Sequence, residues 1–228
     1  MASAIVLNGQ VGLLTPRQQL ALAGKYFTVS NPTLGTAVVG ATITASSATA
    51  NGLFVIANNA PSGGASIILD NLFLRLRSTA PTGTLTMQFE AFNETGIVAG
   101  TTAVVSQTPV QVNTGMAQTS IATVQSFAAG CITIPAAVGT RRRQGYASLA
   151  TGVAVDGDVY ELQFGADGVA ASKNGGAAAR ATDPARIVAS FPPVIIAPQT
   201  TSWINMWWLT QAANVPSWEY GLNFVEMS

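Results

Sequence analysis

Two neighbouring segments alternate apolar and polar side chains with a period of two, and this pattern constrains the fold most. Residues 72–77 read LFLRLR, and residues 84–91 read TLTMQFEA. Side chains two positions apart lie on the same face of a β-strand, so each segment predicts a strand with one face towards a core. The intervening residues 80–83 (APTG) have turn chemistry, which predicts a hairpin or a tight β corner.

Short strand-forming segments continue along the rest of the chain without helices between them. They cover residues 36–45, 53–57, 96–105, 110–112, 121–124, 131–134, 149–155, 159–164, 187–191, 194–197, 203–209 and 218–227. The turn Asp156-Gly157-Asp158 separates two of them. Such a series predicts a sandwich or barrel. The fold we expect is all-β, a jelly-roll-like antiparallel β sandwich over residues 36–228, since a jelly roll uses about eight strands in two sheets.

The N-terminal segment differs from the rest and predicts an arm over residues 1–35 that contains one small helix. Thr15 suits the N-cap, Pro16 the first helical position, and Gln18 completes a capping-box pattern. Gly24 is a natural C-terminal stop. A helix this short must dock on its own β core or on a neighbouring subunit.

The surface is expected to carry few charges, because charged residues make up 9% of the chain against about 25% in typical proteins. Soluble monomers normally keep a well-charged surface. The composition therefore favours a chain whose surface is covered by other subunits; a secreted protein with a Thr/Ser/Asn surface is the alternative. Ten acidic and ten basic residues cancel, so we expect no nucleic acid and no membrane as partner.

Catalytic and metal chemistry is restricted by the absence of histidine and the presence of a single cysteine, Cys131. Ser-His and Cys-His pairs and the usual zinc sites are excluded. Cys131 lies in an apolar run, which favours a buried, inert thiol. We expect no enzymatic activity, no catalytic residues, no cofactor and no metal.

One acidic cluster is a candidate metal or catalytic site: Asp156, Asp158, Glu161 and Asp167. Calcium requires six to eight oxygen ligands, of which an Asp-x-Asp turn supplies some. The same residues are standard turn chemistry, and the EF-hand pattern is absent. A glycosidase with paired carboxylates lacks an evident cleft here.

Two groups of residues are candidate partner contacts. Arg141, Arg142 and Arg143 form the only basic run, predicted as a loop that pairs with an acidic patch or phosphate, or is simply solvated. Trp203, Trp207 and Trp208 lie in one strand, with Trp218 following. They predict either a carbohydrate-stacking platform or, as we favour, a core face and a subunit contact.

The order of these features resembles the jelly-roll decoration (cement) proteins on the heads of tailed bacteriophages. It rests on the helical arm, on the segment LFLRLR at 72–77, on the strand after Asp158 and on the closing strands at 194–225. The resemblance implies a homotrimer bound to the major capsid protein on the capsid exterior of the virion. The absence of a signal peptide pattern fits assembly in the host cytoplasm.

The expected function is therefore a virion structural protein that decorates and stabilises a phage capsid. A receptor- or glycan-binding head of a tail fibre, or a lectin-like module, is the alternative that would use an exposed aromatic patch. A jelly-roll capsid protein that forms shells from this chain alone is a further alternative.

Overall fold

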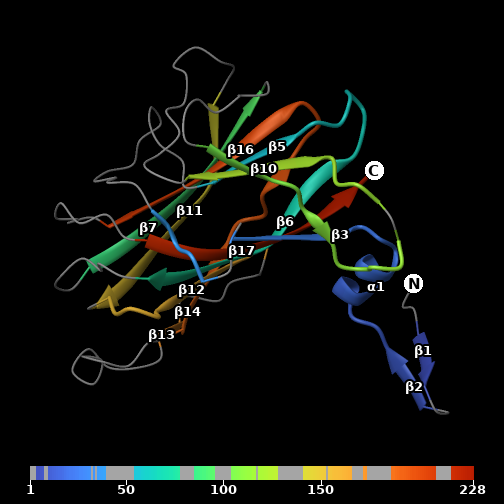
Figure 1. The fold of residues 1–228 in the computed structure, drawn as a ribbon, viewed down its shortest axis with the longest axis horizontal. Helices are drawn as coiled ribbons and strands as arrows, with labels where there is room; N and C mark the ends of the chain where they lie inside the picture. Colours follow the sequence, from blue (N-terminus) through green and yellow to red (C-terminus); the bar gives the residue numbers. More distant parts are fainter. Residues whose placement is uncertain are drawn as a thin grey trace.

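The computed structural model describes residues 4–7, 10–31, 33, 35–39, 54–77, 85–95, 104–116, 118–127, 141–152, 154–165, 172–173, 186–208 and 217–228. These residues form two large sheets and one two-stranded hairpin, with a single short helix (Figure 1). No helix in the described ranges is long and apolar enough to cross a membrane.

The six-stranded sheet contains, in spatial order, β11 (Arg141–Gly152), β7 (Leu85–Thr95), β16 (Thr200–Trp208), β5 (Phe54–Asn58), β10 (Ala122–Phe127) and β8 (Val104–Gln107). The nine-stranded sheet runs from β13 (Ser172–Lys173) through β14 (Arg186–Phe191), β12 (Val159–Phe164), β6 (Ser66–Arg77), β17 (Ser217–Met227) and β3 (Tyr26–Ser30) to β9 (Val110–Gln111). In addition, β15 (Ile195–Ile196) pairs with β6 and β4 (Val38–Val39) with β17.

The connectivity of the central strands is that of a jelly roll. In that fold the first strand pairs with the eighth, the eighth with the third and the third with the sixth, while the other sheet joins second, seventh, fourth and fifth. Here β3-β17-β6-β12 form the first set and β5-β16-β7-β11 the second. The predicted fold class is confirmed. All described pairings are antiparallel except that of β12 with β14, which is parallel.

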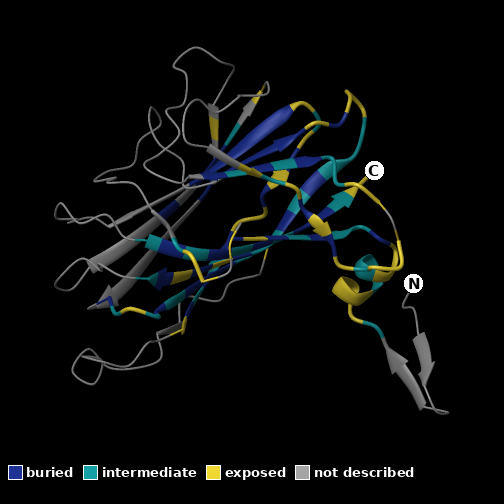
Figure 2. Cartoon of the chain, in the orientation of Figure 1, coloured by how far each residue is buried: buried dark blue, intermediate teal, exposed yellow. Residues whose placement is uncertain are grey.

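The core lies between the two sheets and is built from the alternating residues (Figure 2). Along β6, Leu72, Leu74 and Leu76 are fully buried, whereas Phe73 and Arg75 are exposed. The predicted one-sided strand is therefore confirmed. Because β6 and β7 belong to different sheets, the hairpin alternative is wrong and the chain passes from one sheet to the other. Residues 78–84, where the turn was expected, lie outside the described residues.

The turn at residues 156–158 is also confirmed, and it is fastened to the end of β6. Gly157 has a φ of 89°, which glycine adopts at little cost. The Asp158 carboxylate accepts the Val155 N–H at 3.0 Å. The Gly157 N–H donates to the carbonyl of Leu76 at 2.8 Å. This network joins β12 to β6 at a defined register.

The predicted helix is present as α1 (Pro16–Leu22), with the capping box of Thr15 and Gln18 formed and Gly24 at φ 69° after its end. The boundary of the arm at residue 35 is corrected, because Tyr26–Ser30 is a strand of the sandwich, paired with the C-terminal strand β17. Before α1, β1 (Ala4–Leu7) and β2 (Gln10–Leu13) form a hairpin. Residues 4–24 are called the arm below.

Candidate functional site

Salt bridges gather on the outward face of the nine-stranded sheet and on α1. Arg75 and Arg77 of β6 face Glu219 of β17 at 3.7 and 3.8 Å. Arg186 of β14 pairs with Glu161 of β12. Arg75, Arg77 and Glu219 alternate with buried residues along β6 and β17, so they point away from the core, whereas Glu161 is itself buried. Among the described residues, five charged side chains are thus paired on this sheet.

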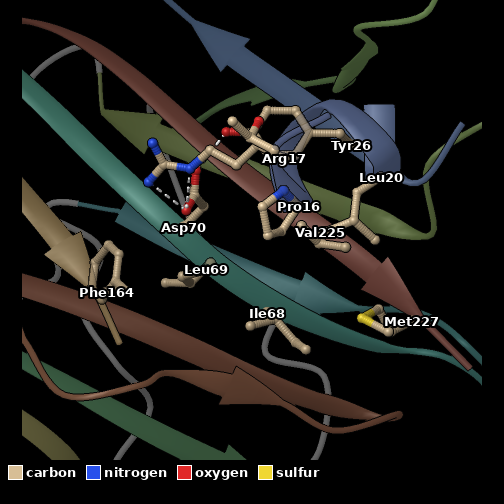
Figure 3. A pocket seen from close by; sticks show the side chains of 11 residues that line it. Pro16, Arg17, Leu20, Tyr26, Ile68, Leu69, Asp70, Phe164, Val225 and Met227 are labelled. Atoms are coloured by element: carbon tan, nitrogen blue, oxygen red, sulfur yellow. Dashed lines mark hydrogen bonds and ion pairs between the residues drawn. The ribbon is translucent and has the colours of Figure 1, made fainter. Parts of the chain in front are cut away.

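The arm is anchored to this face by a cluster of Arg17, Asp70 and Tyr26 (Figure 3). The Arg17 Nε and Nη2 atoms donate to Asp70 Oδ1 at 3.0 and 2.8 Å. The Tyr26 hydroxyl donates to Asp70 Oδ2 at 2.5 Å. Burial, the hydrogen bond and the negative charge of Asp70 together raise the pKa of Tyr26, so the hydroxyl remains a donor. Arg17 is the only charged residue among residues 1–24, and this contact fixes it to the sandwich.

Beneath α1 lies a hollow of about 550 Å³, within the range of small-ligand cavities. Its floor is apolar, and α1 itself has no buried residue. The lining consists of Thr15, Pro16, Arg17, Leu20, Tyr26, Ile68, Leu69, Asp70, Phe164, Val225 and Met227 (Figure 3). Its one carboxylate, Asp70, is already paired with Arg17 and Tyr26. The arrangement holds the helix by polar contacts and leaves apolar surface beneath it.

A second feature lies at the other end of α1, where the edge strand β9 exposes apolar side chains. Val110 is 63% exposed and Leu22 is 55% exposed, with Val112 and Met116 beside them in sequence also exposed. The Gln111 Nε2 donates to the Gly24 carbonyl at 2.6 Å, and the Asn113 Nδ2 donates to the Leu22 carbonyl at 3.2 Å. The β9 edge therefore lies against the C-terminal end of α1.

Sequence reasoning missed this edge, although the sequence carries a signal for it. No charged residue occurs between Glu94 and Arg141. This charge-free stretch contains β10 and β8, the last two strands of the six-stranded sheet, and β9, the last strand on the path of the nine-stranded sheet. The signal for this edge is the length of the stretch without charge, since no motif marks it.

The three arginines do not lie in a loop, as expected, but in the edge strand β11, opposite Glu94, Asn93 and Phe92 of β7. Their consecutive positions alternate between the two faces of the sheet. Arg142 is exposed, while Arg141 and Arg143 are described in their backbone alone. Basic residues on an edge strand discourage unwanted pairing with other strands, which gives this run a structural role.

The tryptophans are not assembled into one platform. Trp203 is only 1% exposed and lies between Val55 and Phe92, both buried. Trp218 lies in the core, edge-on to Tyr160 at a centroid distance of 5.8 Å. Burial removes Trp203 from the predicted partner contacts. Trp207 and Trp208 lie in β16 opposite Gln88 and Met87, and their side chains lie outside the description.

The acidic residues are likewise separated. Asp158 holds the turn, and Glu161 binds Arg186 and Gln163. Burial would raise the pKa of Glu161, but the hydrogen bonds from Arg186 and Gln163 outweigh it and lower the pKa. Asp167 and Cys131 lie outside the described residues. Within the described ranges, no three Asp, Glu or Cys side chains converge as a metal site would require.

Comparisons of the chain with protein-family models, with curated proteins and with solved structures find no match in any of the three.

Proposed function

We propose that this chain is a structural subunit of a virus particle that decorates and stabilises a phage capsid from its exterior. The observation that carries the proposal is a jelly roll bearing an uncharged N-terminal hairpin, held outside the sandwich on a capped and anchored helix. The two strands of the hairpin pair with each other and with no other described strand, which suits attachment to another protein surface.

The distribution of charge supports the same proposal. Arg75, Arg77 and Arg186 are paired with acids on the outer face of the nine-stranded sheet. The side formed by β8, β9 and β10 belongs to a stretch without charge. Charged residues are depleted at the centre of protein–protein interfaces. An uncharged side next to an uncharged arm therefore favours stable contacts with neighbouring subunits.

The glycan-binding alternative is supported less well. Aromatic platforms need exposed rings, and both Trp203 and Trp218 are buried. They also belong to different sheets. The jelly roll itself occurs in lectins as well as in coats, so the fold alone does not separate the two functions.

The proposal is tested by sedimentation of the chain with intact particles. Purified capsids lacking the chain are mixed with it and separated on a density gradient, alongside a variant that lacks residues 1–13. We expect the full chain to migrate with the particles and to raise their resistance to heating, whereas the truncated chain stays at the top. Failure of the full chain to bind any particle from its own source would contradict the proposal.

A shell-forming role is distinguished by the same preparation. Under the proposal, the chain alone forms small oligomers. Closed shells of this chain without another capsid protein would instead identify it as the coat protein.

A further inference from the structure

The hairpin of β1 and β2 extends away from both sheets beyond α1 (Figure 1). Its strands pair with each other, and no other described strand pairs with either. Its sequence includes Ile5, Val6, Leu7 and Val11, with no charge before Arg17. An isolated two-stranded hairpin is marginally stable in water, so this one requires a surface on which to pair.

The edge strand β9 offers such a surface. It ends the path of the nine-stranded sheet, and its Val110 side chain is 63% exposed. Natural edge strands are usually protected by charge or by a covering element. Two other edge strands of this molecule follow that rule, since β11 carries Arg141–Arg143 and β13 carries Lys173. The β9 edge lies in the charge-free stretch and carries no charged residue, and the end of α1 is held beside it through the side chains of Gln111 and Asn113.

We infer that the hairpin of one copy adds to the β9 edge of a second copy. Strand addition supplies backbone hydrogen bonds, and alternate side chains supply apolar contact. Both partners lack charge, so their association avoids the cost of removing ions from water.

We infer that the hairpin on the β9 edge comes from a second copy because of where the arm joins the sandwich. The chain's own α1 ends against β9, through Gln111 and Asn113, while its own hairpin extends away from the sheets (Figure 1). The C-terminal end of each arm, at Leu22 and Gly24, therefore lies beside the β9 edge. In the proposed assembly, that same edge receives the hairpin of the next copy. Such head-to-tail contacts close into a ring when the rotation permits. The inference goes beyond the proposed function, since it holds for any assembly of this chain.

Disulfide trapping tests the contact directly. In one chain Cys131→Ser is combined with Val6→Cys, and in a differently tagged chain with Val110→Cys; Val11→Cys replaces Val6→Cys in a parallel series, because the two residues are cross-strand partners. The matched control for the second chain is Ile195→Cys, an exposed aliphatic residue on β15. We expect the 110 pair to form at least about ten-fold more mixed disulfide than the 195 pair, because binding raises the effective thiol concentration.

A full-chain variant provides the second measurement. Val110→Lys places a charge on the edge and is expected to reduce the oligomer to a monomer with unchanged circular dichroism, whereas Ile195→Lys leaves the oligomer intact. Equal trapping at 110 and 195, or an oligomer that survives Val110→Lys, would overturn the inference. A monomeric chain that still sediments with particles overturns the inference but leaves the proposed function standing. An oligomer that binds no particle contradicts the proposed function but leaves the inference standing.

Discussion

Asp70 is the residue on which the position of the arm depends. It accepts hydrogen bonds from Arg17 on the helix and from Tyr26 on the first sandwich strand. The two partners differ in exposure: the Arg17 side chain is 58% exposed, whereas Tyr26 is partly buried. Exposed ion pairs contribute little because solvent screens them. The hydroxyl contact is therefore expected to carry most of the stabilisation.

Substitution of Tyr26 by Phe tests this ranking. We expect the free energy of unfolding in urea to fall by about 1.5–3 kcal/mol, as for hydrogen bonds to charged groups. Arg17→Ala should cost less than about 1 kcal/mol. The double variant should deviate from additivity, because both groups bind one carboxylate. A larger loss for Arg17→Ala than for Tyr26→Phe would refute the ranking.

The Glu161–Arg186 pair gives a prediction for pH. The pKa of Glu161 is lowered in the folded protein, so its contribution is present above the unfolded pKa of about 4.3. That contribution is lost as the pH falls through the folded pKa. Glu161→Gln should thus lower stability by about 1 kcal/mol near neutral pH and by a smaller amount at an acidic pH below about 4.3. Chemical denaturation at both pH values measures the difference; a constant gap would show that ionisation plays no part.

At the level of elements, contact between β11 and β14 depends on a glycine. A Cβ atom at Gly145 would lie 2.3 Å from Phe191 Cε1, whereas one at Gly221 of β17 would meet nothing closer than 4.0 Å. Gly145→Ala is therefore expected to destabilise the fold by about 1–3 kcal/mol through overpacking. Gly221→Ala, the matched control, should change stability by no more than about 0.5 kcal/mol. Thermal unfolding of the two variants distinguishes them, and equal effects would contradict the packing of Phe191 described here.

We expect α1 to unfold by itself while the β sandwich stays folded. It has seven residues and none of them is buried, so its cap matters more than its packing. Thr15→Ala removes the cap at a cost of about 1 kcal/mol. Amide hydrogen exchange should become faster over residues 16–22, while the unfolding midpoint of the sandwich stays unchanged. Faster exchange in β6 or β17 as well would show that the helix is part of the core.

The elements that local chemistry determines were predicted from the sequence. The capping box of Thr15 and the turn at residues 156–158 depend on neighbouring residues alone, and both are present. Strand β3 was missed because Tyr26–Ser30 is short and pairs with β17, nearly two hundred residues away. The hairpin or corner at residues 80–83 was left open for the same reason, since the choice of sheet is made by distant strands.

The candidate site was less predictable than the fold. The Arg17–Asp70 contact joins residues far apart in the chain, and no local pattern marks it. Trp203 was expected at a surface because tryptophan is common in interfaces, but its neighbours Val55 and Phe92 are buried with it. Composition shows that the chain has few charges, whereas only the topology shows that β8, β9 and β10, which belong to the charge-free stretch, lie at the ends of the two sheets.

At the scale of the whole molecule, the jelly roll separates two kinds of surface. One face carries the paired charges and the anchored helix, and the adjoining side carries the uncharged edge strand β9. Under the proposed assembly, the arm and this side are both covered by other subunits. We therefore propose that the chain works as an assembled subunit, not as a free monomer.

The most direct test of this claim is the solution mass of the purified full chain, measured by light scattering over a range of concentrations. The account predicts a discrete oligomer, with three times the chain mass of 23.4 kDa for the expected homotrimer. It also predicts a return to the mass of one chain in the Val110→Lys variant. A stable, soluble monomer of the unmodified chain at every concentration would contradict assembly between copies of this chain, because the uncharged arm and edge would then be tolerated in water.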